Sequence, residues 1–278
     1  MPGLPVEVDR GVGEFLTAVD ELAPGLVTGF YLVGSVALGD FHAPGAGRFG
    51  PASDIDFVAV LDRRATAGSP EPAALAAAHA RTMAAFPRPF LDGTVLTWDD
   101  LAAGPQACPD GPGALGGRFA ATGQFGFDPV TFCELAWHGT TVRGPRPADL
   151  DLWADRDALR AFTLDNLRTY WRPWWRRHER LRPRSLAAGL STWFPVWAVL
   201  GVCRLHHVVA TGTMTSKTGA GRYARREFEP RWQCVIAESL FLRTNGVEGR
   251  RDYHDPVTRR RDTLAFLDAK IESALALA

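Results

Sequence analysis

The chain carries two linked stretches, Phe30-Tyr31-Leu32-Val33-Gly34-Ser35 and Ser53-Asp54-Ile55-Asp56-Phe57-Val58-Ala59-Val60-Leu61. Their short apolar runs are rich in β-branched and aromatic residues, which predicts two buried strands over 30–33 and 55–61. Side chains two residues apart lie on the same face of a strand, so Asp54 and Asp56 present two carboxylates side by side. No Lys or Arg lies within several residues of this pair, and two close carboxylates repel unless a cation lies between them. The stretch therefore predicts a divalent metal site, and oxygen ligands favour Mg²⁺, which binds through one or two carboxylates and substrate phosphates.

Gly34 and Ser35 follow the first predicted strand directly. A glycine lets the backbone approach a phosphate closely, and a serine at a helix start offers a hydroxyl and a backbone N–H. The pair therefore predicts phosphate binding. The alternative is a glycine-rich surface turn followed by a strand with two acids on its solvent face. Because Asp is disfavoured in strands, the functional interpretation is the stronger one.

Further along the chain, apolar periodicity and turn residues indicate the order of elements. Helices are predicted over 12–22, 65–85 and 130–138, a third strand over 88–97, and loops over 40–51 and 103–117. Beyond Ala158 the pattern is helical almost throughout, with breaks near Arg182-Pro183 and Thr211-Gly212-Thr213. We therefore expect a boundary near residue 150, between a first domain over 1–150 and a helical domain over 151–278.

Charge is divided unevenly between these two parts, although the net charge of the 278-residue chain is zero. Residues 1–155 contain nine Arg and 19 acids, a balance of −10, and residues 156–278 contain 22 basic residues and 12 acids, a balance of +10. A negatively charged ligand with its metal could bridge the two oppositely charged parts. Simple attraction between two domains would give the same charge balances. The pI of about 7.1 does not suggest binding to long nucleic acid. No apolar run of spanning length, no signal sequence and four scattered cysteines predict a cytoplasmic protein that does not bind membranes.

A Gly-Ser pair, then a loop, then Asp-x-Asp on the next strand resembles the signature of the nucleotidyltransferase superfamily. Gly34-Ser35 and Asp54-x-Asp56 match it, with Ser53 beside the acids and a longer loop than usual. The resemblance implies a small mixed sheet flanked by helices, an α/β (α+β) domain. It also implies a third acid on a neighbouring strand, which binds metal or removes the proton of the attacking hydroxyl. Asp92 is the candidate for that third acid.

Alternatives to Asp92 remain open in the sequence. Asp92-Gly93 has the composition of a turn, as Asp-Gly often does. Asp99 and Asp100 also follow the predicted third strand, but their position indicates a helix start.

A second resemblance lies in the C-terminal half. The stretch Leu200-Gly201-Val202-Cys203-Arg204 continues through a Thr-Gly turn to Thr215-Ser216-Lys217. This is similar to the all-α helical-bundle domain of the streptomycin/spectinomycin adenylyltransferases, in which an Arg and a Lys bind the ATP phosphates. The resemblance implies that Arg204 and Lys217 bind nucleotide. Only two lysines occur among 31 basic residues, and a lysine at a helix start suits a phosphate.

The acceptor is much less well indicated. Aminoglycoside enzymes hold their cationic drugs with acids in the helical domain, yet Phe194 stands where one is expected. Residues 165–194 hold seven arginines and only two acids, so a cationic ligand is repelled unless Glu134, Asp165 or Glu179 lines the pocket. A tryptophan-rich cluster is more often core than a stacking platform for a sugar or a flat acceptor. Its members are Tyr170, Trp171, Trp174, Trp175, Trp193 and Trp197.

Taken together, the resemblances imply a Mg²⁺-dependent transferase that moves AMP from ATP to a hydroxyl of a small molecule and releases pyrophosphate. An aminoglycoside-type antibiotic is one candidate acceptor, which would make the protein a resistance enzyme. An adenylyltransferase acting on a protein or a natural-product intermediate is an alternative. A catalytically silent nucleotide-binding module is another, but the intact set of acids argues against it.

Overall fold

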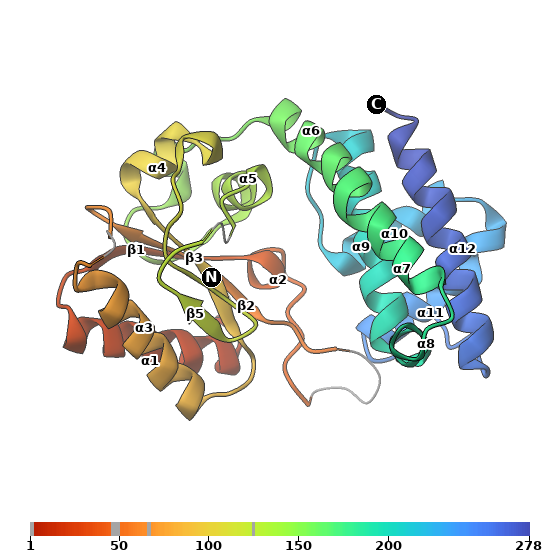
Figure 1. Ribbon diagram of the computed structural model, residues 1–278, viewed down its shortest axis with the longest axis horizontal. Coiled ribbons are helices and arrows are strands. Elements are labelled where there is room, and N and C mark those ends of the chain that lie inside the picture. Colours follow the sequence, from red (N-terminus) through yellow and green to blue (C-terminus); the bar gives the residue numbers. More distant parts are fainter. Residues whose placement is uncertain (1–2, 46–50, 66–67, 124–125) are drawn as a thin grey trace. The chain divides into compact units, whose positions relative to one another are not determined.

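The computed structural model describes residues 3–45, 51–65, 68–123 and 126–278 (Figure 1). The chain divides into two compact units, the first formed mainly by residues up to Asp155 and the second mainly by Arg156–Ala278. The first unit contains a six-stranded sheet with helices, and the second is helical. This confirms the predicted fold class.

The sheet of the first unit has the strand order β5-β4-β3-β2-β1-β6. It is mixed, because β2 and β3 run parallel while every other pair of neighbours is antiparallel. The parallel pair is joined through α3 (Glu71–Ala85), as a parallel connection requires a crossover. The strands are β1 (Val27–Val33), β2 (Ile55–Leu61), β3 (Leu91–Thr97), β4 (Gly113–Leu115), β5 (Arg118–Ala120) and β6 (Thr140–Arg143).

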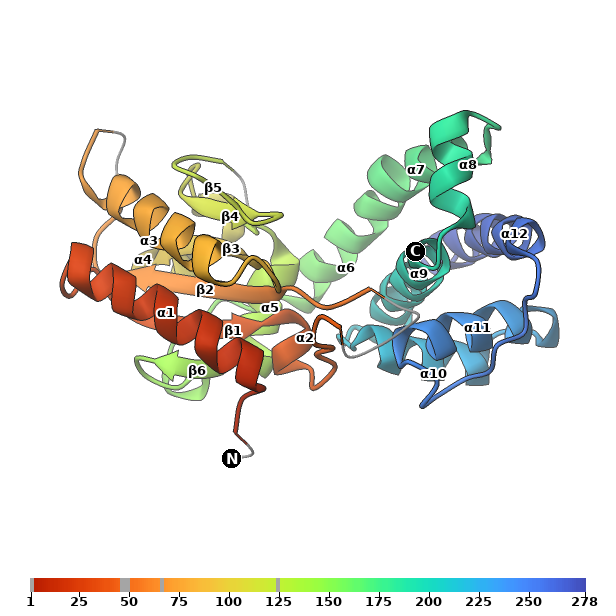
Figure 2. The ribbon, with the colours of Figure 1, turned by 90° about the horizontal axis from the view of Figure 1, so that it is seen from below.

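Each face of this sheet is covered by its own helices. Alternate residues of β1 and β2, such as Phe30 and Phe57, pack with α1 (Val6–Leu22) and α3, which lie side by side in Figures 1 and 2. The residues between them, such as Tyr31 and Val58, face α4 (Trp98–Ala103) and α5 (Pro129–His138). Both faces are therefore buried, which explains why β1 and β2 are nearly continuous apolar runs.

The sequence missed three short strands. The segment predicted as an exposed loop over 103–117 holds the 3₁₀ turn η1 (Pro105–Ala107) and the start of the β4–β5 hairpin. Gly116 and Gly117 both have positive φ, +60° and +71°, which suits a two-residue hairpin turn. β6 lies shortly before the predicted boundary near residue 150 and is followed by the 3₁₀ turn η2 (Pro147–Asp149). These strands have three or four residues each, too short for a clear period-2 pattern.

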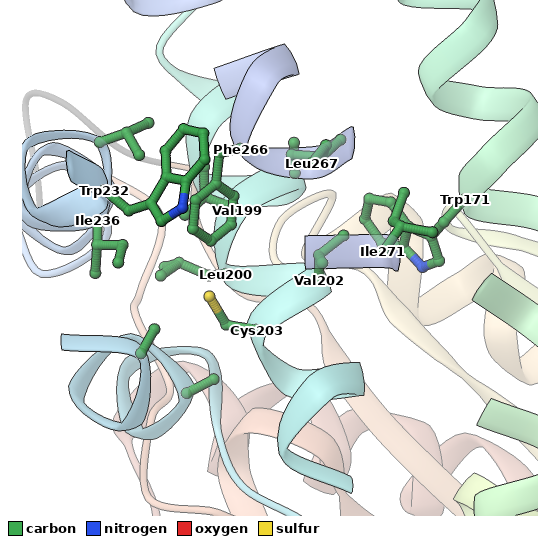
Figure 3. Packing of buried hydrophobic residues seen from close by; sticks show 14 of the residues in the cluster. Trp171, Val199, Leu200, Val202, Cys203, Trp232, Ile236, Phe266, Leu267 and Ile271 are labelled. Atoms are coloured by element: carbon green, nitrogen blue, oxygen red, sulfur yellow. The ribbon is translucent and has the colours of Figure 1, made fainter. Parts of the chain in front are cut away.

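The second unit is built around one apolar helix, α9 (Trp193–Thr211). Figure 3 shows its side chains Val199, Leu200 and Val202 lying between Trp232 and Ile236 on one side and Ile271 and Trp171 on the other. The predicted breaks are confirmed between α7 and α8 and at Gly212, which ends α9 in the left-handed conformation. The remaining elements are α6 (Arg156–Asn166), η3 (a π-helical turn, Leu167–Trp171), α7 (Arg172–Glu179), α8 (Pro183–Leu190), α10 (Lys217–Glu227), η4 (Pro230–Trp232), α11 (Gln233–Arg243) and α12 (Pro256–Leu275).

By length and composition alone, α9 would be able to cross a membrane, contrary to the expectation from the sequence. Its most apolar window is 61% buried inside the unit. That burial is typical of the central helix of a bundle, which is apolar on all sides because helices surround it.

Candidate active site

The centre of the candidate site is the close approach of Gly34 to Asp56. Gly34 has φ +62° and begins the single-turn helix α2 (Gly34–Ala37) at the end of β1. Asp56 lies on β2 directly opposite Val33, the last residue of β1. A Cβ atom at position 34 would lie 2.0 Å from the Asp56 Oδ2 atom. Only glycine fits there, so the glycine of the predicted motif makes room for the carboxylate as well as for the turn.

Ser35 presents a buried hydroxyl at the same place. Its Oγ atom is buried and has no hydrogen-bond partner in the part of the chain that the structure describes. A buried polar atom without a partner is costly, which makes it a sign of a ligand or water that completes the site. The predicted helix start at Ser35 is confirmed by α2.

Asp54 lies just before β2, with its side chain 44% exposed. The Arg88 Nη1 atom lies 3.9 Å from the Asp54 Oδ1 atom, and the same guanidinium lies 3.5 Å from the centroid of the Phe90 ring. No Lys or Arg is close to the acid pair in the sequence, but the fold brings Arg88, three residues before β3, to Asp54. Arg88 is 59% exposed, so the ion pair is screened by solvent and is weak.

Asp92 is brought beside Asp56 by the parallel pairing of β3 with β2, where the two residues are exact register partners. Asp92 is only 8% exposed. Its two carboxylate oxygens accept hydrogen bonds from the backbone N–H groups of Gly116 and Gly117, at 2.7 and 2.9 Å. Asp92 therefore holds the β4–β5 turn, a role the sequence did not indicate. A carboxylate has about four lone-pair positions, so two remain for other partners.

The three acids do not form a closed metal cluster. Over residues 3–45, 51–65, 68–123 and 126–278, no group of three or more His, Cys, Asp or Glu side chains is arranged to hold a metal ion. Two carboxylates together with substrate phosphates are enough for Mg²⁺. The pair Asp54 and Asp56 fits that requirement, and the Ser35 hydroxyl follows Gly34, which closely approaches Asp56.

Ser53, also predicted to bind nucleotide, has a structural role. Its hydroxyl accepts a hydrogen bond from the backbone N–H of His42 at 3.1 Å, and its own N–H donates to the His42 carbonyl at 2.8 Å. Ser53 is 6% exposed. It therefore holds the two ends of the loop that separates Gly34-Ser35 from the acid pair.

Arg204 and Lys217 lie in the second unit. Arg204 is half-buried on α9 and makes no hydrogen bond or ion pair with another described residue. Lys217 is the first residue of α10, whose N-cap Ser216 accepts a hydrogen bond from the Gly219 N–H at 3.0 Å. The Lys217 ammonium lies 5.2 Å from the ring centroid of Trp197, a cation–π contact. Trp197 was not predicted as a site residue. The sequence held a signal for it, because Trp197 precedes Arg204 by seven residues, about two helical turns, which places both on the same side of the helix.

Other reactive side chains are held in structural positions. His206 is bonded through Nδ1 to the Tyr223 hydroxyl (3.0 Å) and through Nε2 to Ser273 (3.2 Å). Burial lowers the pKa of His206 to about 4, and the nearby Lys270 acts in the same direction. Burial also raises the pKa of the Cys108 thiol to about 12, which keeps it neutral. Neither residue has the setting of a nucleophile or its base.

Comparison with known proteins adds evidence on the fold. No protein-family model and no curated protein sequence matches the chain. Among solved structures, it is similar to the spectinomycin adenyltransferase AAD(9) from Enterococcus faecialis, crystallised with ATP and spectinomycin. The match has a TM-score of 0.61 and 12% sequence identity, and it covers 95% of this chain and 98% of the other. The chain therefore has the fold of that nucleotidyltransferase across both units.

Proposed function

We propose, from this nucleotidyltransferase fold, that the protein transfers AMP from Mg²⁺-ATP to a hydroxyl group of a small molecule. The observation that carries the proposal is the packing of Gly34 against the Asp56 carboxylate beside the partnerless Ser35 hydroxyl. A phosphate close to Gly34 and Ser35 would accept hydrogen bonds from the Ser35 hydroxyl and from backbone N–H groups. Asp54 and Asp56 would hold Mg²⁺, which neutralises phosphate charge and polarises the phosphoryl oxygens.

The transfer is direct, so the protein itself forms no covalent bond to the transferred group. The acceptor oxygen forms a bond to the α-phosphorus while the bond between the α-phosphorus and the α,β-bridging oxygen breaks, and pyrophosphate leaves with that oxygen. Asp92, as register partner of Asp56, would accept the proton of the attacking hydroxyl. Its hydrogen bonds from Gly116 and Gly117 fix the orientation of the carboxylate for that task. Arg204 and Lys217 would bind phosphate oxygens, for which the Arg204 guanidinium is suited because it has no partner among the described residues.

Pyrophosphate release tests the proposal. Wild-type protein is incubated with ATP, Mg²⁺ and a panel of hydroxylated compounds that includes spectinomycin and streptomycin, and products are examined by mass spectrometry for addition of AMP. Asp56→Asn is the matched inactive control. Binding of Mg²⁺-ATP without any product across the panel would support the silent nucleotide-binding module instead. Absence of Mg²⁺-ATP binding would reject both.

A further inference from the structure

We infer that the acceptor is a flat ring compound without positive charge, which stacks on Trp193. This inference rests on the proposed function and names its substrate class. The evidence is a stack of three indole rings, Trp171, Trp197 and Trp193, hereafter the indole stack. Trp171 and Trp197 are stacked with centroids 6.0 Å apart, and Trp197 and Trp193 with centroids 5.5 Å apart. The interplanar angles are 27° and 14°.

The indole stack runs from the core to solvent. Trp171 is 5% exposed and anchored in the core of the second unit, Trp197 is half-buried, and Trp193 is 40% exposed. Gly201 makes the inner contact possible, because a Cβ atom there would lie 2.7 Å from the Trp171 ring. One face of Trp193 is covered by Trp197, so its exposed surface remains for another ring. An indole held rigidly in this way presents a large stacking surface at little entropic cost.

The indole stack adjoins the cations assigned to the nucleotide. Lys217 contacts the ring of Trp197, and Arg204 follows Trp197 by about two turns on the same side of α9. A ring stacked on Trp193 would therefore be separated from Lys217 by a single indole, that of Trp197.

Charge in this part of the unit disfavours a polycation. Residues 180–226 contain no Asp or Glu, and they include α8, α9 and α10. Lys217 and the arginines of this stretch make it strongly basic. α9 also starts at Trp193 without a side-chain cap, so its positive helix end is not offset by a carboxylate. The exposed Glu179 and Glu227 bracket the stretch.

Most other carboxylates of the second unit already have partners within the protein. They form ion pairs with neighbouring arginines and a lysine, or cap a helix. The pairs are Asp268 and Glu272 with Arg172, Glu238 with Arg259, Glu229 with Lys270, Glu248 with Arg222, Asp252 with Arg250 and Asp262 with Arg261, and Asp255 caps α12. A polycationic aminoglycoside would therefore meet uncompensated positive charge at Trp193, whereas a neutral or anionic ring would not.

Isothermal titration calorimetry with the full chain tests the inference, with and without a non-hydrolysable Mg²⁺-ATP analogue. The probes are 7-hydroxycoumarin as a flat neutral ring, 7-hydroxycoumarin-3-carboxylate as a flat anion, and streptomycin as a polycation. We expect both coumarins to bind more tightly than streptomycin. Trp193→Ala should weaken coumarin binding by about threefold to tenfold, the range for aromatic stacking. Trp193→Phe should retain most of the affinity, and Leu181→Ala, which alters a 75% exposed residue before α8, should retain all of it.

The inference is overturned if streptomycin binds more tightly than the coumarins, or if Trp193→Ala keeps full coumarin affinity. These outcomes are separate from failure of the proposed function. A protein that releases pyrophosphate only with streptomycin retains the function and loses this acceptor class. A protein that binds coumarins through Trp193 but does not bind Mg²⁺-ATP retains the stacking site and loses the function.

Discussion

Gly34 shows how one residue without a side chain sets the geometry of the candidate site. We expect Gly34→Ala to abolish turnover, because the new methyl group would lie 2.0 Å from the Asp56 Oδ2 atom and displace the carboxylate. Gly39→Ala is a matched control, since Gly39 has a similar φ of +65° and no heavy atom within 4 Å of the added Cβ. Both variants carry the backbone cost of a positive φ, about 1–2 kcal/mol. Thermal melts and pyrophosphate assays separate this shared cost from the clash; equal activity in the two variants would contradict the role of Gly34.

Asp56 carries a negative charge that the proposed metal site requires. Replacement by Asn removes the negative charge while it preserves the volume, so we expect loss of turnover and of Mg²⁺-dependent ATP binding with an unchanged melting temperature. Calorimetry with ATP, with and without Mg²⁺, is the measurement. Asp62→Asn, at the far end of β2, serves as the control. Normal turnover in Asp56→Asn would exclude the metal assignment.

Asp92 has one structural role and one proposed catalytic role, and one substitution can separate them. Asp92→Asn leaves one of the Gly116 and Gly117 N–H groups without an acceptor, so we expect a stability loss of about 1–3 kcal/mol. If Asp92 is also the base, the rate should fall by roughly 10²–10⁴-fold with ATP binding retained. Denaturant unfolding and single-turnover rates are compared. A stability loss without a rate loss would make Asp92 a structural residue of the hairpin only.

Among the elements, α9 and α10 carry the two cations that we propose bind nucleotide, Arg204 and Lys217. We expect Arg204→Ala and Lys217→Ala each to weaken Mg²⁺-ATP binding by at least about tenfold, because a charge-assisted bond to phosphate is worth about 1.5–3 kcal/mol. Arg225→Ala, an exposed residue in the last turn of α10, is the control. Calorimetric affinities are the readout. Wild-type affinity in both variants would confine the nucleotide to the first unit.

The elements also show what sequence can and cannot predict. β2 was predicted over its observed range because its residues are apolar on both faces, and Asp99 and Asp100 were correctly assigned to a helix start, where Thr97 and Asp100 form a capping box. The β4–β5 hairpin was missed, because each of its strands has only three residues and three of the eight residues over 113–120 are glycine. The contact of Arg88 with Asp54, and the bonds from Gly116 and Gly117 to Asp92, join residues far apart in the chain. Such tertiary contacts produce no pattern in the local sequence, so they could not be predicted from it.

Across the whole molecule, the buried histidines predict sensitivity to acid. Burial lowers the pKa of His178, His206 and His207 in the second unit, for His206 to about 4. Below pH ~6.5 the unfolded chain therefore binds more protons than the folded one at these sites, and stability falls as pH decreases towards 4. We expect a lower melting temperature at pH 5 than at pH 7.5. His206→Asn should reduce this difference, whereas the exposed His254→Asn should not; an unchanged pH dependence in His206→Asn would contradict the assignment.

The acid-free stretch between Glu179 and Glu227 has a practical consequence for mapping the site. A protease that cleaves only after acidic residues leaves this stretch as a single peptide, with Trp193, Arg204 and Lys217 all on it. Light-activated cross-linking with an azido-ATP, or with an azido derivative of the acceptor, would therefore mark one identifiable mass. Trypsin would then divide that peptide at its many arginines and show which helix carries the label.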